Sequence, residues 1–237
     1  MTLDAYTRTA PFYDLWHEDG HVPEIRKLLP PLLDGVTGGV LEIGAGTGLI
    51  TQVIGDTVPG EIFAVEPSLG MRAILLSRLS DRPSLRARVT VLPCGALDAD
   101  LDEPVEAAVM ISVLYGFAPP ERPKLWETLA RQLRPGGRLI FNWRQRPVGV
   151  PGPPEVMGSY RVGRHTYEIL GQVVSATPEM ATSRFSYRVL QRGVVISEDT
   201  VESDGYRPSL EELTAELTAA GFTPGTAPAG LLTWHHP

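Results

Sequence analysis

The sequence predicts an α/β fold with a doubly wound, mostly parallel sheet and an antiparallel β insertion before the last helix. Two patterns predict it. Between residues 38 and 143, short runs that are apolar throughout alternate with stretches of helical periodicity. Such runs are typical of strands buried on both faces of a parallel sheet. Residues 159–201 instead alternate in character and are rich in Tyr, Val, Ile, Thr and Arg, which favours antiparallel strands.

The N-terminal part predicts helical structure ahead of the first strand. Residues 6–16 form a polar and aromatic segment. A helix is expected over residues 23–33, because Pro23 suits the first helical position and Ile25 and Leu29 recur on one face. A loop that contains glycine ends this helix.

Alternating strands and helices follow. The expected strands are residues 40–43, 62–65, 89–92, 107–114 and 138–143. The expected helices are residues 47–57, 69–79 and 124–133.

The character of the chain changes after residue 143. Residues 147–154 are rich in Pro and Gly and cannot belong to the sheet. Two to four antiparallel strands are expected beyond them. The last helix begins at Ser209, which forms a capping box with Glu212, and ends at Gly221. The residues after it leave room for one strand, or for two short ones.

Composition excludes several classes of protein. The chain has 237 residues and a net charge of −7, which argues against broad contact with nucleic acid. The single cysteine, Cys94, permits no intramolecular disulfide. The sequence has no apolar run of about 18 residues and no signal-peptide pattern at its start. We therefore expect a soluble, cytoplasmic protein without a nucleic-acid or membrane partner.

The first expected strand runs into three closely spaced glycines, Gly44, Gly46 and Gly48. Glycines allow a sharp turn and the close approach of a ligand to the backbone, although a tight packing turn is an alternative explanation. The dinucleotide pattern G-x-G-x-x-G fails because Leu49 stands at the third glycine, and the lysine of a P-loop is absent. Glu66 follows the second strand and could accept hydrogen bonds from ribose hydroxyls, or be a solvated acid.

The stretch VLEIGAGTG resembles motif I of the class I S-adenosylmethionine-dependent methyltransferases, hh(D/E)hGxGxG. Glu42 and the three glycines match this motif. The similarity continues with Ser68 and Met71 after the acid, and with the LRPGG turn at residues 133–137. It covers about residues 38–143. The resemblance implies a Rossmann-like fold and S-adenosylmethionine as cofactor.

The resemblance also implies a set of cofactor-binding residues. This family often places an Asp after the third strand, but Gly95 stands there, so backbone groups at Gly95 and Ala96 are expected to meet the adenine. The implied cofactor residues are Tyr13, Glu42, Gly44, Gly46, Gly48, Glu66, Pro67, Met71, Gly95, Ala96 and Ser112.

Tyr13, Tyr115 and His17 are the candidate catalytic residues, ranked in that order. Tyr13 lies in a leading segment that, in similar enzymes, folds over the cofactor, and its hydroxyl could orient an acceptor. Core packing is the alternative for both tyrosines. His17 has a side chain suited to taking a proton. His17 and His21 are four apart, but Gly20 intervenes and no third ligand is evident, so no metal is expected.

The resemblance suggests four segments. These are an N-terminal helical cap at residues 1–34, a Rossmann-like cofactor-binding core at 35–146, an antiparallel β insertion acting as a substrate lid at 147–204, and a C-terminal helix and strand at 205–237.

Arginine is concentrated in the insertion. Eight arginines stand against seven acids between Arg144 and Arg207, a balance of +1, whereas the remaining 13 bases and 21 acids give −8. Such arginines could recognise a carboxylate or phosphate of a substrate, or could form a solvated face.

We expect a methyltransferase that acts on nitrogen or oxygen of a small molecule, such as a secondary metabolite, as a monomer or homodimer. Two other classes stay open. One is a catalytically silent module that binds S-adenosylmethionine and regulates a partner. The other is a nucleotide-dependent oxidoreductase, which Leu49 disfavours.

Overall fold

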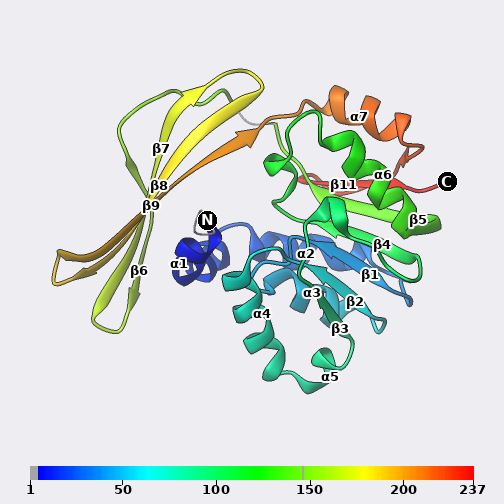
Figure 1. The fold of residues 1–237 in the computed structure, drawn as a ribbon, viewed down its shortest axis with the longest axis horizontal. Helices are drawn as coiled ribbons and strands as arrows, with labels where there is room; N and C mark the ends of the chain where they lie inside the picture. The colour runs from blue at the N-terminus through cyan, green and yellow to red at the C-terminus, as the bar shows by residue number, and fades with distance from the viewer. Residues whose placement is uncertain (1–4, 146) are drawn as a thin grey trace.

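The computed structural model describes residues 5–145 and 147–237. It contains a seven-stranded and a four-stranded sheet, which stand side by side (Figure 1). The expected α/β class, with a mostly parallel sheet and an antiparallel insertion, is confirmed. The first four residues of the expected segment 1–34, and Arg146 at the end of the expected segment 35–146, lie outside the described residues.

Seven α-helices lie within the described residues. They are α1 Ala5–Asp19, α2 Val22–Leu32, α3 Leu49–Thr57, α4 Leu69–Ser80, α5 Pro83–Arg86, α6 Arg122–Gln132 and α7 Leu210–Ala219. Two short 3₁₀ helices are η1 Ala96–Asp98 and η2 Leu114–Gly116.

The large sheet has the strand order β10-β11-β5-β4-β1-β2-β3. Its strands are β1 Val40–Ile43, β2 Ile62–Val65, β3 Val89–Leu92, β4 Val105–Met110, β5 Leu133–Asn142, β10 Thr223–Pro224 and β11 Leu231–His235. Strands β1 to β5 pair in parallel, whereas β11 is antiparallel to both of its neighbours. The chain order reverses between β1 and β4, and ligands bind at such a switch point in open α/β sheets.

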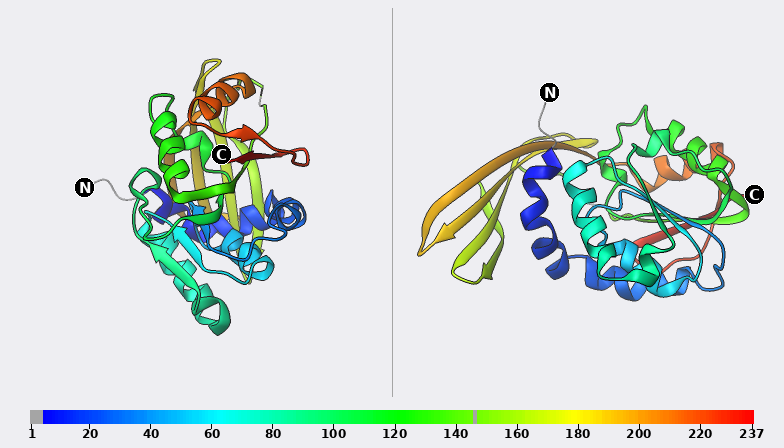
Figure 2. Two further views of the ribbon diagram at one scale, coloured as in Figure 1. Left: turned by 90° about the vertical axis from the view of Figure 1, so that its right-hand side faces the viewer. Right: turned by 60° about the horizontal axis from the view of Figure 1, so that its bottom comes forward.

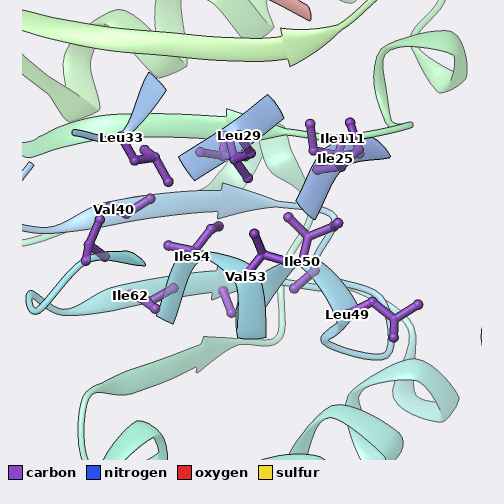
Figure 3. Packing of buried hydrophobic residues seen from close by; sticks show 14 of the residues in the cluster. Ile25, Leu29, Leu33, Val40, Leu49, Ile50, Val53, Ile54, Ile62 and Ile111 are labelled. Atoms are coloured by element: carbon purple, nitrogen blue, oxygen red, sulfur yellow. The ribbon is translucent and has the colours of Figure 1, made fainter. Parts of the chain in front are cut away.

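Helices cover both faces of this sheet. On one face, α2 and α3 bury an aliphatic layer that includes Leu29 and Ile54 against β1 and β2 (Figure 3). On the other face, Trp126 of α6 and Leu213 of α7 are fully buried. These two layers explain why the strands are apolar throughout. They hold the carboxyl ends of β1, β2 and β4 in place.

Some elements differ from the expected ones in their ends. Strand β4 ends at Met110 rather than at residue 114, because Ser112 has a φ of +61° and a 3₁₀ turn begins at Leu114. Strand β5 begins at Leu133, earlier than expected. The last helix has the expected capping box between Ser209 and Glu212. Two short strands follow it.

The insertion forms the four-stranded antiparallel sheet β6-β7-β8-β9. Its strands are β6 Glu155–Val162, β7 His165–Ala176, β8 Met180–Gln191 and β9 Val194–Tyr206. Helix α1 lies between this sheet and the large sheet with its helices (Figure 2). Phe12 of α1 packs at 5.3 and 5.2 Å from the rings of Tyr167 and Tyr187. This contact joins α1 to the insertion.

Candidate functional site

A cavity of about 220 Å³ opens at the carboxyl ends of β1, β2 and β4. Helix α1 closes it from one side, and the segment that follows β4 closes it from the other. Its lining includes eight of the implied cofactor residues, Tyr13, Gly44, Gly46, Glu66, Pro67, Met71, Ala96 and Ser112. Glu42, Gly48 and Gly95 are not part of this lining, nor are His17 and Tyr115.

The glycine loop after β1 needs its glycines for different reasons. Gly44 and Gly46 have φ values of +71° and +58°, which strain residues with side chains. A Cβ on Gly44 would lie 2.5 Å from Val113 Cγ2, so this position also requires glycine for space. Gly48 caps α3, and a Cβ there would lie 2.5 Å from Leu75 Cδ1. Gly44 and Gly48 therefore both allow close packing, and Gly44 and Gly46 also line the cavity.

Glu66 is held in one orientation beside this loop. Its side chain is buried, with 6% of its surface exposed. Oε2 accepts a hydrogen bond from Gly46 N at 2.8 Å, and Oε1 accepts one from Ser68 N at 2.7 Å. Among the described residues that line the cavity, Glu66 is the only charged one. The cavity thus suits a ligand that is cationic or rich in hydroxyl donors.

Tyr13 reaches the cavity because α1 is tied to the glycine loop. Asp14 accepts a hydrogen bond from Thr47 Oγ1 at 2.5 Å and pairs with Arg78. Arg78 Nε in turn donates to Thr47 O at 2.9 Å. Burial, and then the neighbouring Tyr6 and Glu66, raise the pKa of the Tyr13 hydroxyl above its ordinary value. Tyr13 therefore stays neutral and can donate or accept a hydrogen bond.

The other two catalytic candidates lie elsewhere. The His17 ring is 4.1 Å from the ring of Tyr13 and 4.8 Å from that of His21. Burial, together with His21, lowers the pKa of His17 to about 4. The Tyr115 hydroxyl accepts a hydrogen bond from Arg144 N at 3.1 Å and lines a separate cavity. The fold thus brings Tyr13 and His17 together and leaves Tyr115 apart from them.

Two residues at the site were missed by the sequence reasoning. Tyr6 lines the cavity, and its spacing of seven residues from Tyr13 on one helix was the available signal. His21 lies 3.2 Å from the hydroxyl of Ser112, measured from Nε2 to Oγ. Local sequence gives no signal for this second contact, because Ser112 comes from a segment 91 residues away.

Ser112 is itself held by the adjacent strand. Its N donates to Asn142 Oδ1 at 2.6 Å, and Asn142 Nδ2 donates to Ser112 Oγ at 3.4 Å. This pair of bonds stabilises the left-handed backbone at Ser112, a conformation that costs energy in residues other than glycine. The hydroxyl consequently has a defined place on the cavity wall. No group of three or more His, Cys, Asp or Glu side chains in residues 5–145 and 147–237 could hold a metal.

Glu42 is buried behind the glycine loop, with 2% of its surface exposed. Its Oε2 has no hydrogen-bond partner among the described residues. Burial raises the pKa of this carboxyl to about 7, Thr51 lowers it slightly, and Glu66 adds a further increase. The protonated form of Glu42 is therefore more favoured in the folded protein than in the unfolded chain.

This preference predicts a pH-dependent effect of Glu42→Gln on stability. The folded pKa lies above the unfolded value of 4.5, so the contribution of Glu42 to the free energy of unfolding falls as pH rises from about 4.5 to about 7. The loss approaches about 3 kcal/mol. We expect Glu42→Gln to be more stable than wild type at pH 8 by much of that amount, and similar to it at pH 5.

Urea unfolding of both proteins at the two pH values measures this effect. His17 contributes in the opposite direction, because its lowered pKa removes stability as pH falls from 6.5 towards 4. The difference between variant and wild type cancels that contribution. Glu61→Gln, at the exposed start of β2, is the matched control. An equal difference at pH 5 and pH 8 would contradict the raised pKa.

Comparison with known proteins places the central part of the chain in one family. The family model described as a methyltransferase domain matches residues 40–137. An uncharacterized methyltransferase of Schizosaccharomyces pombe is 31% identical over 115 residues, which are 48% of this chain and 42% of the relative. Another uncharacterized methyltransferase, from Staphylococcus carnosus, is 27% identical over 146 residues, which are 59% of this chain and 66% of the relative. The matched part of the chain thus spans about two fifths to two thirds of the length of these relatives.

Solved structures match over nearly the whole chain. DesVI from Streptomyces venezuelae has a TM-score of 0.76 at 19% identity, with 94% of this chain and 95% of that chain covered. The sugar N-methyltransferase KedS8 from Streptoalloteichus has a TM-score of 0.72 at 20% identity, with 94% and 92% covered. CalS10 from Micromonospora echinaspora, an amino pentose methyltransferase with S-adenosylmethionine bound, has a TM-score of 0.72 at 17% identity, with the same coverage as KedS8. At these identities the likeness concerns the fold, including the inserted antiparallel sheet.

Proposed function

We propose that this chain, which belongs to the class I S-adenosylmethionine-dependent methyltransferases, transfers the methyl group of S-adenosylmethionine to a nitrogen or oxygen atom of a small molecule. The observation that carries the proposal is the cavity at the carboxyl ends of β1, β2 and β4, where Glu66 accepts a hydrogen bond from the glycine loop. The described chain contains no helix of the length and apolarity that crossing a bilayer requires.

The lining of the cavity fits this cofactor. Gly44 and Gly46 place the loop backbone on the wall of the cavity. Glu66 provides acceptors for ribose hydroxyls, and the apolar side chains of Met71 and Ala96 suit an adenine. The absence of Lys and Arg among the described lining residues suits a sulfonium, which is a cation.

The chain's own residues have mainly a positioning task. The bound cofactor supplies an electrophilic methyl group with its leaving group already attached. Tyr13 and Ser112, which both line the cavity, would orient the acceptor atom towards that group, because both side chains can donate and accept hydrogen bonds. The four-stranded sheet, at residues 155–206, overlaps the expected lid 147–204 and extends two residues beyond it. Together with α1 it would cover the acceptor and exclude water.

Amines on sugars are the acceptors we would test first. DesVI, KedS8 and CalS10 share this chain's fold over more than 90% of their lengths, and two of the three are described as methyltransferases of sugars or amino pentoses. An amine acceptor must present a neutral lone pair, and the neutral Tyr13 hydroxyl could orient it by a hydrogen bond.

An acceptor screen with methyl-labelled S-adenosylmethionine tests the proposal. The panel contains amino sugars, matched sugars with hydroxyl in place of the amine, and small phenols and amines of other kinds. We expect label in at least one small acceptor, with S-adenosylhomocysteine formed in equal amount. Cofactor binding without transfer to any acceptor would favour a regulatory module. Binding of NADH in preference to S-adenosylmethionine would favour an oxidoreductase.

A further inference from the structure

The hydroxyl of Ser112, on the cavity wall, is contacted by side chains from two other parts of the chain. Asn142 Nδ2 donates to its Oγ at 3.4 Å, and His21 Nε2 lies 3.2 Å from the same oxygen. The orientation of the Asn142 amide is fixed, because its Oδ1 accepts the backbone N–H of Ser112 at 2.6 Å. Ser112 Oγ therefore accepts one hydrogen from Asn142, and it has its own hydrogen and one lone pair for two further contacts.

Core packing sets the distance between His21 and Ser112. Val22 and Ile111, their neighbours in the chain, are both buried and belong to the same hydrophobic cluster. Asn142 is buried as well, at the end of β5. The left-handed backbone at Ser112 adds to this picture, because such strain persists where the surroundings hold it and is common at functional sites. Three elements thus hold the three side chains together at the wall of the cavity.

The ring of His21 does not serve its own helix. His21 precedes α2, at the position where a side chain often accepts a hydrogen bond from the first N–H groups of a helix. Among the described residues, the His21 side chain makes no such capping bond. Its carbonyl accepts the hydrogen bond from Ile25 N at 3.0 Å. The ring instead lies beside Ser112.

Two arrangements of hydrogens fit the contact between His21 and Ser112. If Nε2 carries a hydrogen, Oγ accepts twice and turns its own hydrogen towards the cavity. If Nε2 is the acceptor, the hydroxyl donates to it and turns a lone pair towards the cavity. Glu66 is the only charged residue among the described ones that line the cavity, which suits a cation such as a sulfonium. A lone pair faces a cation more favourably than a hydroxyl hydrogen does, so the second arrangement is favoured.

We propose that His21 is a positioning residue that accepts the hydrogen of the Ser112 hydroxyl, so that Ser112 offers a lone pair to an acceptor atom that carries a hydrogen. This inference rests on the proposed function and narrows the acceptor to neutral compounds with an N–H or O–H group. An amine that donates an N–H to Ser112 keeps its lone pair in another direction, where it can face the methyl group. His21 is not among the described lining residues of the cavity and acts only through Ser112.

Nitrogen NMR of the full chain with isotope-labelled histidine tests the direction of this bond and needs no acceptor. The chain has five histidines, and His21→Gln identifies the signals of His21. With S-adenosylmethionine bound, at about pH 8 and so above the ordinary pKa of imidazole, we expect Nε2 to be unprotonated and Nδ1 protonated. Ser112→Ala should shift the Nε2 signal. A protonated Nε2, or a spectrum of His21 that Ser112→Ala leaves unchanged, would overturn the inference.

Kinetics with the acceptor found in the screen test the effect on transfer. His21→Leu and Ser112→Ala should each lower kcat roughly ten- to a hundredfold, while affinity for S-adenosylhomocysteine stays within a few fold. The double variant should be no slower than Ser112→Ala alone, because His21 acts through that hydroxyl. His21→Gln should recover most of kcat, because its amide oxygen can accept the hydrogen of Ser112. For an amine acceptor, the N,N-dimethyl analogue should receive no label.

His235→Leu is the matched control, because pairing with Arg138 places His235 at the end of the sheet away from the cavity. It should change kcat by less than about twofold. A wild-type kcat in His21→Leu, additive losses in the double variant, or His21→Gln no faster than His21→Leu would overturn the inference. So would labelling of the dimethyl analogue. If the wild-type chain transferred no methyl group to any acceptor, the proposed function would fail, and the spectra would still decide the direction of the bond.

Discussion

Glu66→Gln is expected to bind S-adenosylhomocysteine roughly ten- to a hundredfold more weakly than the wild-type chain. The substitution removes the charge that ribose hydroxyls would meet. It also replaces one of the two oxygens that accept from Gly46 N and Ser68 N with an amide nitrogen, which donates and cannot accept. Both effects act in the same direction, because the carboxylate orients the glycine loop as well as contacting the ligand.

Calorimetry at neutral pH measures this loss. Glu61→Gln removes a carboxylate at the opposite, exposed end of the same strand and should leave the affinity unchanged. A thermal unfolding curve for each variant separates loss of the site from loss of the fold. If Glu66→Gln retained wild-type affinity, the ribose contact assigned to Glu66 would be wrong.

Tyr13→Phe is expected to lower kcat by roughly ten- to a thousandfold while affinity for S-adenosylhomocysteine stays within a few fold. Only the hydroxyl is lost, and the ring still packs beside His17, 4.1 Å away between ring centres. Asp14 still ties α1 to Thr47 and Arg78, so the helix keeps its place. What the variant loses is a group that orients the acceptor.

Steady-state kinetics with the acceptor found in the screen provide the measurement, with both substrates saturating. Thr214→Ala, on helix α7, removes a hydroxyl that donates to Leu210 O within its own helix and should change kcat by less than about twofold. A wild-type kcat for Tyr13→Phe would make Tyr13 a packing residue, and the catalytic role would then fall to Tyr115 or His17.

Patterns within single segments of the sequence were sufficient to predict the parts of the site that a single segment forms. The ends of β1, β2 and β3 agree with the expected runs, because each strand is a short, mainly apolar segment between polar, glycine or proline residues. The glycine loop was predicted from the spacing of its glycines. This was possible because a positive φ depends mainly on the residue at that one position. Eight of the eleven implied cofactor residues line the cavity for the same reason: most of them immediately follow a strand.

Other features depend on contacts between segments that are distant in sequence. The end of β4 was misplaced because the backbone at Ser112 is stabilised by Asn142, 30 residues away on the next strand. The contact between His21 and Ser112 likewise requires the turn between α1 and α2 to lie beside the segment that follows β4. Neither follows from periodicity, which describes only one element at a time.

The arginines show the same division most clearly. Composition revealed that the inserted segment is richer in Arg than the remainder, but left open whether these side chains bind a substrate or face solvent. Strand register decided it for Arg184 and Arg188, since pairing of β8 with β9 sets a glutamate opposite each. Arg144 and Arg207 line the same cavity only because the end of β5, the turn after β7 and the start of α7 lie close together in space. The sequence by itself determined the residue types, the elements and the cofactor motif, because these are set by neighbours along the chain. Which arginines pair with a carboxylate was decided by tertiary structure alone, because electrostatic interaction depends on distance in space.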